Sequence, residues 1–182
     1  MSAIPSLIAK MEKKTSANPL VISVYTRRFY EVVCKEIELA GIDSSHQVLN
    51  IGCGGLPYTA IQLARTTGAF VWALDRDEEA VAAARECVKL LQMEDQIEVL
   101  TLDGTEQLEF DFEVAIVALH SEPKEEILHN LIRAGKPGAR LIFRRPREEV
   151  ANRYDSLPDI PAPCAWVSQS KATFDESVLY KI

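Results

Sequence analysis

The chain has 182 residues, 47% of them hydrophobic and 26% charged, and a formal net charge of −7. This length suits a single domain that buries roughly 70% of its unfolded surface, so no disulfide or metal is needed to hold it together. The negative charge argues against non-specific binding to nucleic acid or to an anionic membrane, and no apolar run approaches the ~20 residues that span a bilayer.

The cysteines give no sign of a metal centre or a disulfide framework. They are widely separated, form no CxxC pair and are accompanied by only three histidines. No zinc-ligand spacing is therefore present, and reduced thiols in a cytoplasmic protein are the simplest interpretation. Residues 1–14 also lack the long apolar core of a signal peptide. The cysteines are Cys34, Cys53, Cys87 and Cys164.

The N-terminal part of the chain is predicted to be helical. Residues 4–14 could form a short helix, which Asn18-Pro19 would end. Residues 21–40 place apolar side chains at the i, i+3, i+4 spacing of an amphipathic helix, and Gly41 follows as its C-cap. We expect residues 1–44 to form a helical cap on a main domain made of residues 45–182.

Strands and helices alternate from residue 47 onward. Short apolar strands are predicted over residues 47–51, 69–74, 97–102, 113–119 and 140–144. Helices are predicted over residues 57–67, 78–93 and 122–134. Short connections then favour parallel strands with helices on both faces. Segments 165–170 and 177–181 add a terminal antiparallel hairpin, so the expected fold is α/β and Rossmann-like, with a mostly parallel seven-stranded sheet.

A glycine-rich turn follows the first predicted strand. It runs Asn50-Ile51-Gly52-Cys53-Gly54-Gly55-Leu56-Pro57. Glycines let the backbone approach a ligand closely, and the helix that follows directs its positive N-terminus at the same point. Such a turn also serves close packing alone, so by itself it is weak evidence for a ligand site.

Two carboxylates strengthen the case for a site at this edge of the sheet. Asp75 ends the second strand, where a carboxylate can accept hydrogen bonds from ribose hydroxyls. Asp103, followed by Gly104, ends the third strand and can accept a hydrogen bond from an adenine amino group. Asp75 could instead cap the next helix, although Asp77 fits that role better, and Asp103-Gly104 could be a simple turn. Together the three elements predict a nucleoside site.

These motifs resemble class I S-adenosylmethionine (SAM)-dependent methyltransferases over roughly residues 45–145. The resemblance rests on residues 48–54, 72–77, 103–104 and 136–143, and it implies SAM as the cofactor. Two departures occur: Asn50 replaces the usual acidic residue, and Leu56-Pro57 replaces the usual third glycine. The residues predicted to bind the cofactor are Asn50, Gly52, Cys53, Gly54, Gly55, Asp75, Arg76, Asp103, Gly104 and Leu119.

The Gly-Leu-Pro departure is similar to the glycine loop of nicotianamine synthases. Residues 118–131 and 137–144 are also similar to parts of those enzymes. Nicotianamine synthases transfer the aminocarboxypropyl group of SAM rather than its methyl group. The N-terminal region here is much shorter than their helical domain, so this resemblance supports the cofactor pocket better than it supports the reaction.

Four residues are candidates for contact with the substrate. His120 follows the fourth strand, where a substrate should approach, and could act as a general base, cap a helix or face solvent. Arg144 could bind a substrate carboxylate bidentately or belong to a solvated basic edge. Tyr25 and Tyr58 could contact the substrate or pack in the core.

The leading interpretation is a SAM-dependent methyltransferase that acts on a small molecule, because little sequence remains for a separate target-recognition domain. The alternatives are aminocarboxypropyl transfer, a non-catalytic SAM-binding accessory protein and, more remotely, an NAD-binding dehydrogenase. No Asn-Pro-Pro-Tyr motif supports methylation of a nucleobase. The expected partner is a small molecule, without nucleic acid, membrane or metal, and a homodimer is an open alternative. The sequence does not determine the acceptor.

Overall fold

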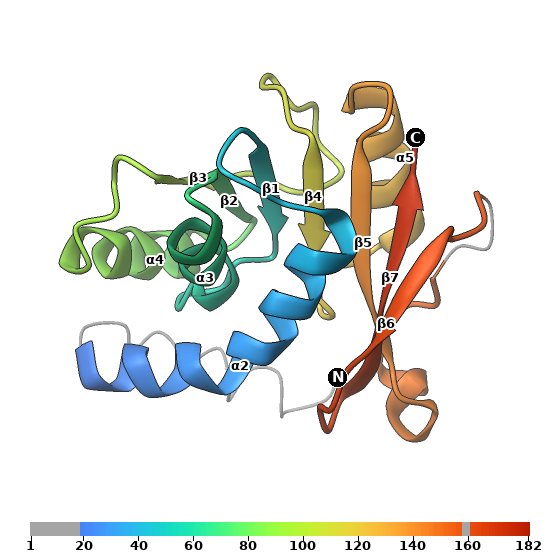
Figure 1. The fold of residues 1–182 in the computed structure, drawn as a ribbon, viewed down its shortest axis with the longest axis horizontal. Coiled ribbons are helices and arrows are strands. Elements are labelled where there is room, and N and C mark those ends of the chain that lie inside the picture. The colour runs from blue at the N-terminus through green and yellow to red at the C-terminus, as the bar shows by residue number, and fades with distance from the viewer. Residues whose placement is uncertain (1–18, 158–160) are drawn as a thin grey trace.

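The computed structural model describes residues 19–157 and 161–182, with the backbone alone at 19–23, 25 and 26 (Figure 1). The helix expected over residues 4–14 therefore lies outside the described residues, and so does the side chain of Tyr25.

Seven strands form one sheet. They are β1 (Gln47–Ile51), β2 (Phe70–Asp75), β3 (Ile97–Thr101), β4 (Val114–Val117), β5 (Arg140–Pro146), β6 (Ala165–Ser168) and β7 (Phe174–Lys181). Their order across the sheet is β3-β2-β1-β4-β5-β7-β6, in which the first five are parallel and β7 pairs antiparallel with both β5 and β6. The predicted parallel sheet with a terminal antiparallel hairpin is confirmed.

Helices cover both faces of this sheet (Figure 1). They are α2 (Pro19–Ala40), α3 (Tyr58–Thr67), α4 (Glu78–Leu90) and α5 (Lys124–Ala134), with a 3₁₀ helix, η1 (Glu148–Arg153), after β5. Successive strand residues point to opposite faces. Val48 accordingly packs in one buried cluster with side chains of α2, α3 and α4, whereas Leu49 packs in a second cluster with side chains of α5.

The α2 helix packs into this core. Val33 and Ala40 are buried in the same cluster as the strands, and α2 contacts α3, β5, β6 and β7. The division of the chain at residue 44 stays a prediction. The η1 helix was not expected because none of its side chains is buried, so it leaves no hydrophobic period in the sequence. No helix within residues 19–157 or 161–182 is long and apolar enough to cross a membrane.

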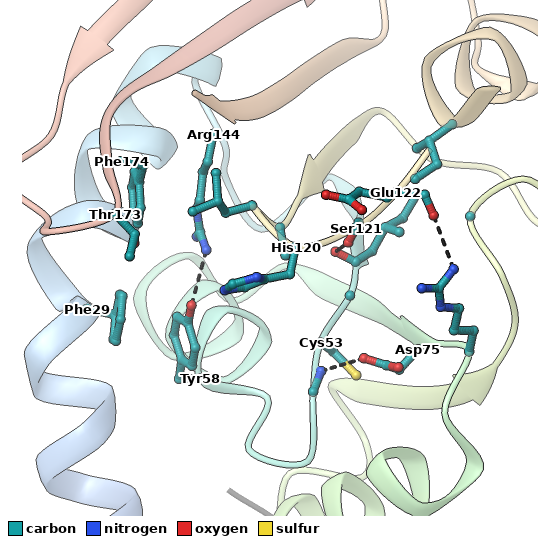
Figure 2. Close-up of a pocket in the computed structure, with 18 of the residues that line it drawn as sticks. Phe29, Cys53, Tyr58, Asp75, His120, Ser121, Glu122, Arg144, Thr173 and Phe174 are labelled. Carbon is teal, nitrogen blue, oxygen red and sulfur yellow. Dashed lines mark hydrogen bonds between the residues drawn. The ribbon is translucent and has the colours of Figure 1, made fainter. Parts of the chain in front are cut away.

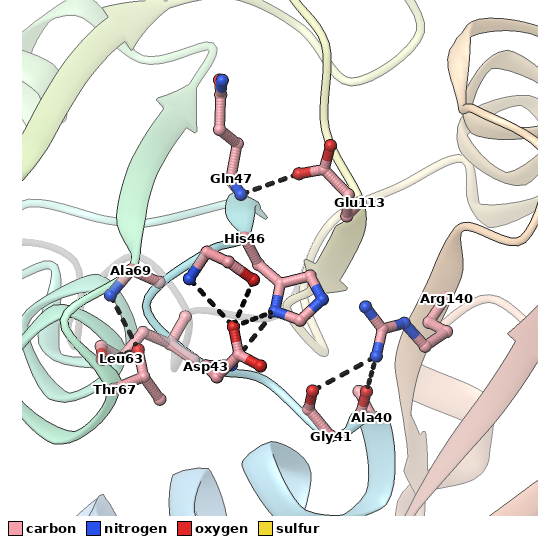
Figure 3. Close-up of polar contacts among 11 residues, drawn as sticks. Ala40, Gly41, Asp43, His46, Gln47, Leu63, Thr67, Ala69, Glu113 and Arg140 are labelled. Carbon is pink, nitrogen blue, oxygen red and sulfur yellow. Dashed lines mark hydrogen bonds and ion pairs between the residues drawn. The ribbon is translucent and has the colours of Figure 1, made fainter.

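Polar contacts close the edge of the sheet at which the parallel strands begin (Figure 3). The Arg140 guanidinium donates hydrogen bonds to the carbonyl oxygens of Ala40 and Gly41, which satisfies the end of α2. Glu113 accepts a hydrogen bond of 2.8 Å from the backbone N–H of Gln47 and ties the start of β1 to the segment before β4. These side chains serve the fold, and the opposite edge is where a ligand can enter.

That opposite edge opens because of the strand order. The chain moves outward from β1 to β2 and β3 on one side, and from β4 to β5 on the other. The loops after β1 and β4 therefore diverge, and open α/β sheets bind ligands at this switch point.

Candidate functional site

A cavity of about 540 Å³ lies at the carboxyl ends of the parallel strands (Figure 2). Its walls come from the glycine turn after β1, the ends of β2 and β3, the loop at 118–122, helices α2 and α3, and the segment at 171–174 before β7. This volume falls within the range of pockets that hold small molecules.

The glycine turn needs glycine for two different reasons. Gly52 and Gly54 adopt φ of +76° and +67°, which side-chain-bearing residues rarely adopt. A Cβ on Gly52 would also lie 2.2 Å from Ser121 Oγ, so the turn and the loop after β4 touch here. The backbone N–H groups of Gly52 and Cys53 both donate to the Leu74 carbonyl, at 2.8 and 2.9 Å, which fixes the turn against the end of β2.

Asp75 is held in place by the backbone on both sides of its carboxylate. Its Oδ2 accepts a hydrogen bond of 2.8 Å from the Gly54 N–H, and its Oδ1 accepts one of 3.0 Å from the Asp77 N–H. Each oxygen can accept a further bond, so the carboxylate stays available to a ligand. Asp77 caps α4 by accepting from the N–H groups of Glu79 and Ala80, as predicted.

Asp103 and Arg76 line the part of the cavity that lies next to the carboxyl end of β3. Asp103 Oδ1 accepts hydrogen bonds from the backbone and hydroxyl of Thr105, at 3.0 and 2.9 Å, which leaves Oδ2 directed elsewhere. Arg76 Nη1 lies 3.7 Å from that Oδ2 and donates to the Glu122 carbonyl at 3.2 Å. Arg76 thus joins the end of β2 to the loop after β4 across the cavity.

The structure brings most of the predicted cofactor-binding residues to the cavity wall. Those that line it are Gly52, Cys53, Gly54, Asp75, Arg76, Asp103, Gly104 and Leu119. Asn50 and Gly55 do not line it, and their contact with the cofactor, directly or through water for Asn50, stays a prediction. Asn50 is buried within β1 and points to the same face as Val48, and its amide donates to the Ile116 carbonyl at 3.2 Å. Gly55 is buried behind the turn.

His120 lines the cavity on the loop after β4, and its surroundings favour the neutral imidazole. Its imidazole ring faces the cavity, and the centroid of this ring lies 5.1 Å from that of Tyr154. Burial lowers the pKa of His120, the positive charge of Lys124 lowers it further, and Glu122 partly opposes both. A neutral ring nitrogen can accept a proton, which general-base catalysis requires.

Lys124 fixes the loop that carries His120, and sequence reasoning missed it. It is fully buried, and its Nζ donates to the carbonyls of Leu119 and Ser121 at 2.7 and 3.0 Å. The available signal was its position, because a lysine in the first turn of α5 is unfavourable with respect to the helix dipole and needs another reason.

Arg144 forms a buried ion pair with Glu36. Its Nε and Nη2 lie 2.9 Å from Glu36 Oε1 and Oε2, its Nη1 donates to the Tyr58 hydroxyl at 3.3 Å, and its Nη2 also donates to Thr59 Oγ1 at 3.1 Å. Ser177 donates to Glu36 at 2.8 Å. Burial alone would lower the pKa of Arg144, but the carboxylate of Glu36 raises it above its ordinary value.

This pairing changes the role expected of Arg144. The guanidinium was a candidate for binding a substrate carboxylate, but Glu36 already occupies its bidentate edge. Arg144 therefore organises the far end of the cavity instead. Glu36 itself was missed, although the sequence carries a signal: a carboxylate on the apolar stripe of α2, next to Val32 and Val33, calls for a buried cation.

Tyr58 lines the cavity and belongs to an aromatic group at its far end, and its contact with a substrate stays a prediction. Its ring stacks on Phe29 with centroids 4.3 Å apart. The Arg144 guanidinium lies 5.5 Å from the Phe174 ring centroid and 6.0 Å from that of Tyr58.

Comparison with known proteins identifies the family. Residues 42–177 match the family model described as a methyltransferase domain. The chain therefore belongs to this family of class I SAM-dependent methyltransferase-like domains, for which SAM is the cofactor.

Curated relatives include the L-histidine 2-aminobutanoyltransferase of Pseudomonas aeruginosa, which is 31% identical over 122 residues. The aligned part covers 66% of this chain and 46% of that enzyme, so the chain spans less than half the length of this relative.

Among solved structures, the nicotianamine synthase MtNAS in complex with MTA and tNA is 25% identical. Its TM-score is 0.80, and the match covers 96% of this chain and 68% of that one. A point mutant of MtNAS in complex with S-adenosylmethionine superposes with a TM-score of 0.81 at 24% identity, covering 94% of this chain and 70% of that one.

The buried ion pair predicts a double-mutant signature. Arg144→Met leaves the buried Glu36 carboxylate without its cation and should lower the free energy of unfolding by about 3–5 kcal/mol. Adding Glu36→Gln removes the stranded charge, so the double variant should be more stable than Arg144→Met alone. Urea unfolding monitored by circular dichroism measures both, and losses that simply add would contradict the coupling.

Proposed function

We propose that this chain transfers the aminocarboxypropyl group of SAM to a small-molecule acceptor. The observation that carries the proposal is the activity named for its curated relatives, 2-aminobutanoyl transfer, at 31% identity over 122 residues. Structural similarity to MtNAS, one of whose complexes contains MTA, supports the same reaction class. Methyl transfer, the leading expectation from the sequence, is the second candidate because the family model is that of a methyltransferase domain.

The residues of the cavity fit SAM. Asp75 keeps an acceptor position on each carboxylate oxygen for the ribose, and Asp103 stands nearby for the adenine. The glycine turn brings backbone close to the ligand without a Cβ. The 47-to-104 segment would therefore hold the adenosine half of the cofactor.

The Leu56-Pro57 departure supports an unusual placement of the amino acid half of SAM. Pro57 has no N–H, and the N–H of Tyr58 is already bonded to the Leu56 carbonyl at 2.7 Å. Pro57 and Tyr58 therefore offer no amide to a carboxylate, which a helix N-terminus normally binds.

When bound, SAM supplies a carbon next to a sulfonium: an acceptor nitrogen attacks that carbon, the carbon–sulfur bond breaks, and the electron pair stays on sulfur. The leaving product is methylthioadenosine when the aminocarboxypropyl group moves, and S-adenosylhomocysteine when the methyl group moves. His120 would take the proton that the acceptor nitrogen loses, because its lowered pKa keeps it neutral near pH 7. Alignment of the two reactants supplies most of the remaining advantage.

The identity of the nucleoside product tests the reaction. Incubation of the protein with SAM and a mixture of amino acids, followed by liquid chromatography and mass spectrometry, should give methylthioadenosine together with an aminobutanoyl adduct. S-adenosylhomocysteine would establish methyl transfer instead. SAM binding without either product would favour the non-catalytic alternative.

Asp75→Ala should weaken SAM binding by about 1–3 kcal/mol, because ribose hydroxyls and the Gly54 N–H would lose a partly buried acceptor. Isothermal titration calorimetry measures the change, with NAD titrated beside SAM to test the dehydrogenase alternative. Asp77→Ala is the matched control: Asp77 caps α4 without lining the cavity, so it should lower stability and leave SAM affinity unchanged. Equal affinity in the Asp75 variant would remove this residue from the site.

His120 predicts a particular pH profile. The base must be neutral, so activity should fall as the pH drops through the pKa of His120, and burial places that fall below the ordinary value of 6.5. His120→Ala should slow turnover by about 10²-fold or more with little change in SAM affinity. His129→Ala, an exposed substitution on α5, is the control and should keep both the rate and the acid limb. An unchanged rate in the His120 variant would retire it as the base.

A further inference from the structure

The cavity continues beyond the region expected for the cofactor. Figure 2 shows Asp75 on one side, His120 in the middle, and Phe29, Thr173 and Phe174 on the other side. This far end is formed by α2 and by the segment that leads into β7, and it also includes Arg28 and Lys171.

Two cations at this end, Arg28 and Lys171, have no ion-pair partner among the residues that the structure describes. Glu36 neutralises Arg144, and Glu31 lies 3.2 Å from the ammonium group of Lys35. Within the described part of the chain, no carboxylate stands at ion-pair distance from Arg28 or Lys171. In a chain of net charge −7, two unmatched cations lining one end of a cavity create a local positive field.

Lys171 is oriented but not saturated. Its Nζ donates to the Arg28 carbonyl at 2.6 Å and lies 5.0 Å from the centroid of the Phe29 ring. An ammonium has three donors, so two remain for a ligand. Burial lowers the pKa of Lys171, Glu31 opposes this, and the charges of Arg28, Lys35 and Arg144 lower it further, so a bound anion would relieve an existing repulsion.

Hydrogen bonds from Arg147 hold the segment that carries Lys171 in place. Arg147 Nε donates to the Lys171 carbonyl at 2.6 Å, and the Arg147 N–H donates to the Thr173 carbonyl at 3.1 Å. The Gln169 N–H donates to the Asp175 carbonyl at 2.6 Å, which closes the turn between β6 and β7. The cation is thus held in position before any ligand arrives, which limits the entropy lost on binding.

We propose that Arg28 and Lys171 bind the carboxylate of the acceptor, so the acceptor is a small amine that carries a carboxylate group. This inference rests on the proposed transfer reaction. A carboxylate held at this end leaves the rest of the acceptor extending toward His120 and the cofactor, as the reaction requires. Arg28 and Lys171, which no carboxylate of the described chain neutralises, thus take the carboxylate-binding role that the sequence suggested for Arg144.

The experiment compares two acceptor pools and three lysine variants. One pool contains the twenty L-amino acids, the other the corresponding decarboxylated amines, and SAM labelled in its aminobutanoyl part reports adduct formation by mass spectrometry. Lys171→Met removes the charge and keeps the stem, whereas Lys171→Arg keeps a charge. Lys35→Met is the matched control, because it removes a nearby cation that is already paired with Glu31 and does not line the cavity.

We expect adducts from the amino acid pool alone. Lys171→Met should raise the KM for the reacting amino acid about tenfold or more with the SAM dissociation constant unchanged, and Lys171→Arg should recover much of the loss. Lys35→Met should behave as the wild type. Equal labelling of the decarboxylated amines, or an unchanged KM in Lys171→Met, would overturn the inference and leave the transfer reaction standing.

Two other results are separately informative. If Lys171→Met weakens SAM binding tenfold, the cations hold the carboxylate of SAM itself, and the acceptor assignment is wrong. If neither pool yields an adduct while SAM binds, the proposed transfer reaction fails and the acceptor assignment fails with it.

Discussion

The buried contact between Arg144 and Glu36 is the interaction on which the cavity depends. It joins β5 to α2, and its neighbours Tyr58, Thr59 and Ser177 bring in α3 and β7. Both charges are out of water, so each is tolerable only while the other is present. The pair therefore fixes where α2 lies on the sheet, and α2 supplies one wall of the cavity. A full guanidinium fork engaged with a carboxylate also has little capacity left for a ligand.

The opposite end of the cavity follows from a different constraint, the close approach of two loops. Gly52 has room for no side chain because Ser121 lies against it. The buried ammonium of Lys124 donates hydrogen bonds to two carbonyl oxygens of the loop that contains Ser121. The glycine turn and the loop with His120 are thus placed relative to each other by packing before a ligand binds. Such preorganisation is what transfer from a sulfonium needs, because alignment matters more there than charge stabilisation.

Charge is divided along the cavity in a way that suits two reactants. Carboxylates stand at the ends of β2 and β3, where a nucleoside offers hydroxyl and amino donors. Cations stand at the end formed by α2 and the segment before β7, and His120 lies between the two regions (Figure 2).

The sequence by itself determined the mostly parallel sheet, the glycine turn and the two carboxylates, because strand periodicity, glycines and residues at strand ends are local signals. The order of the strands across the sheet came from the structure. It also identified Asp77 as the cap of α4. Only the tertiary structure decided which side chains meet. Asn50 sits beside the glycines in the sequence yet points away from the cavity, because a strand alternates its faces. Glu36 and Arg144 are 108 positions apart, and Arg28 and Lys171 are 143 apart, so no local pattern could show that one pair is neutralised and the other is not.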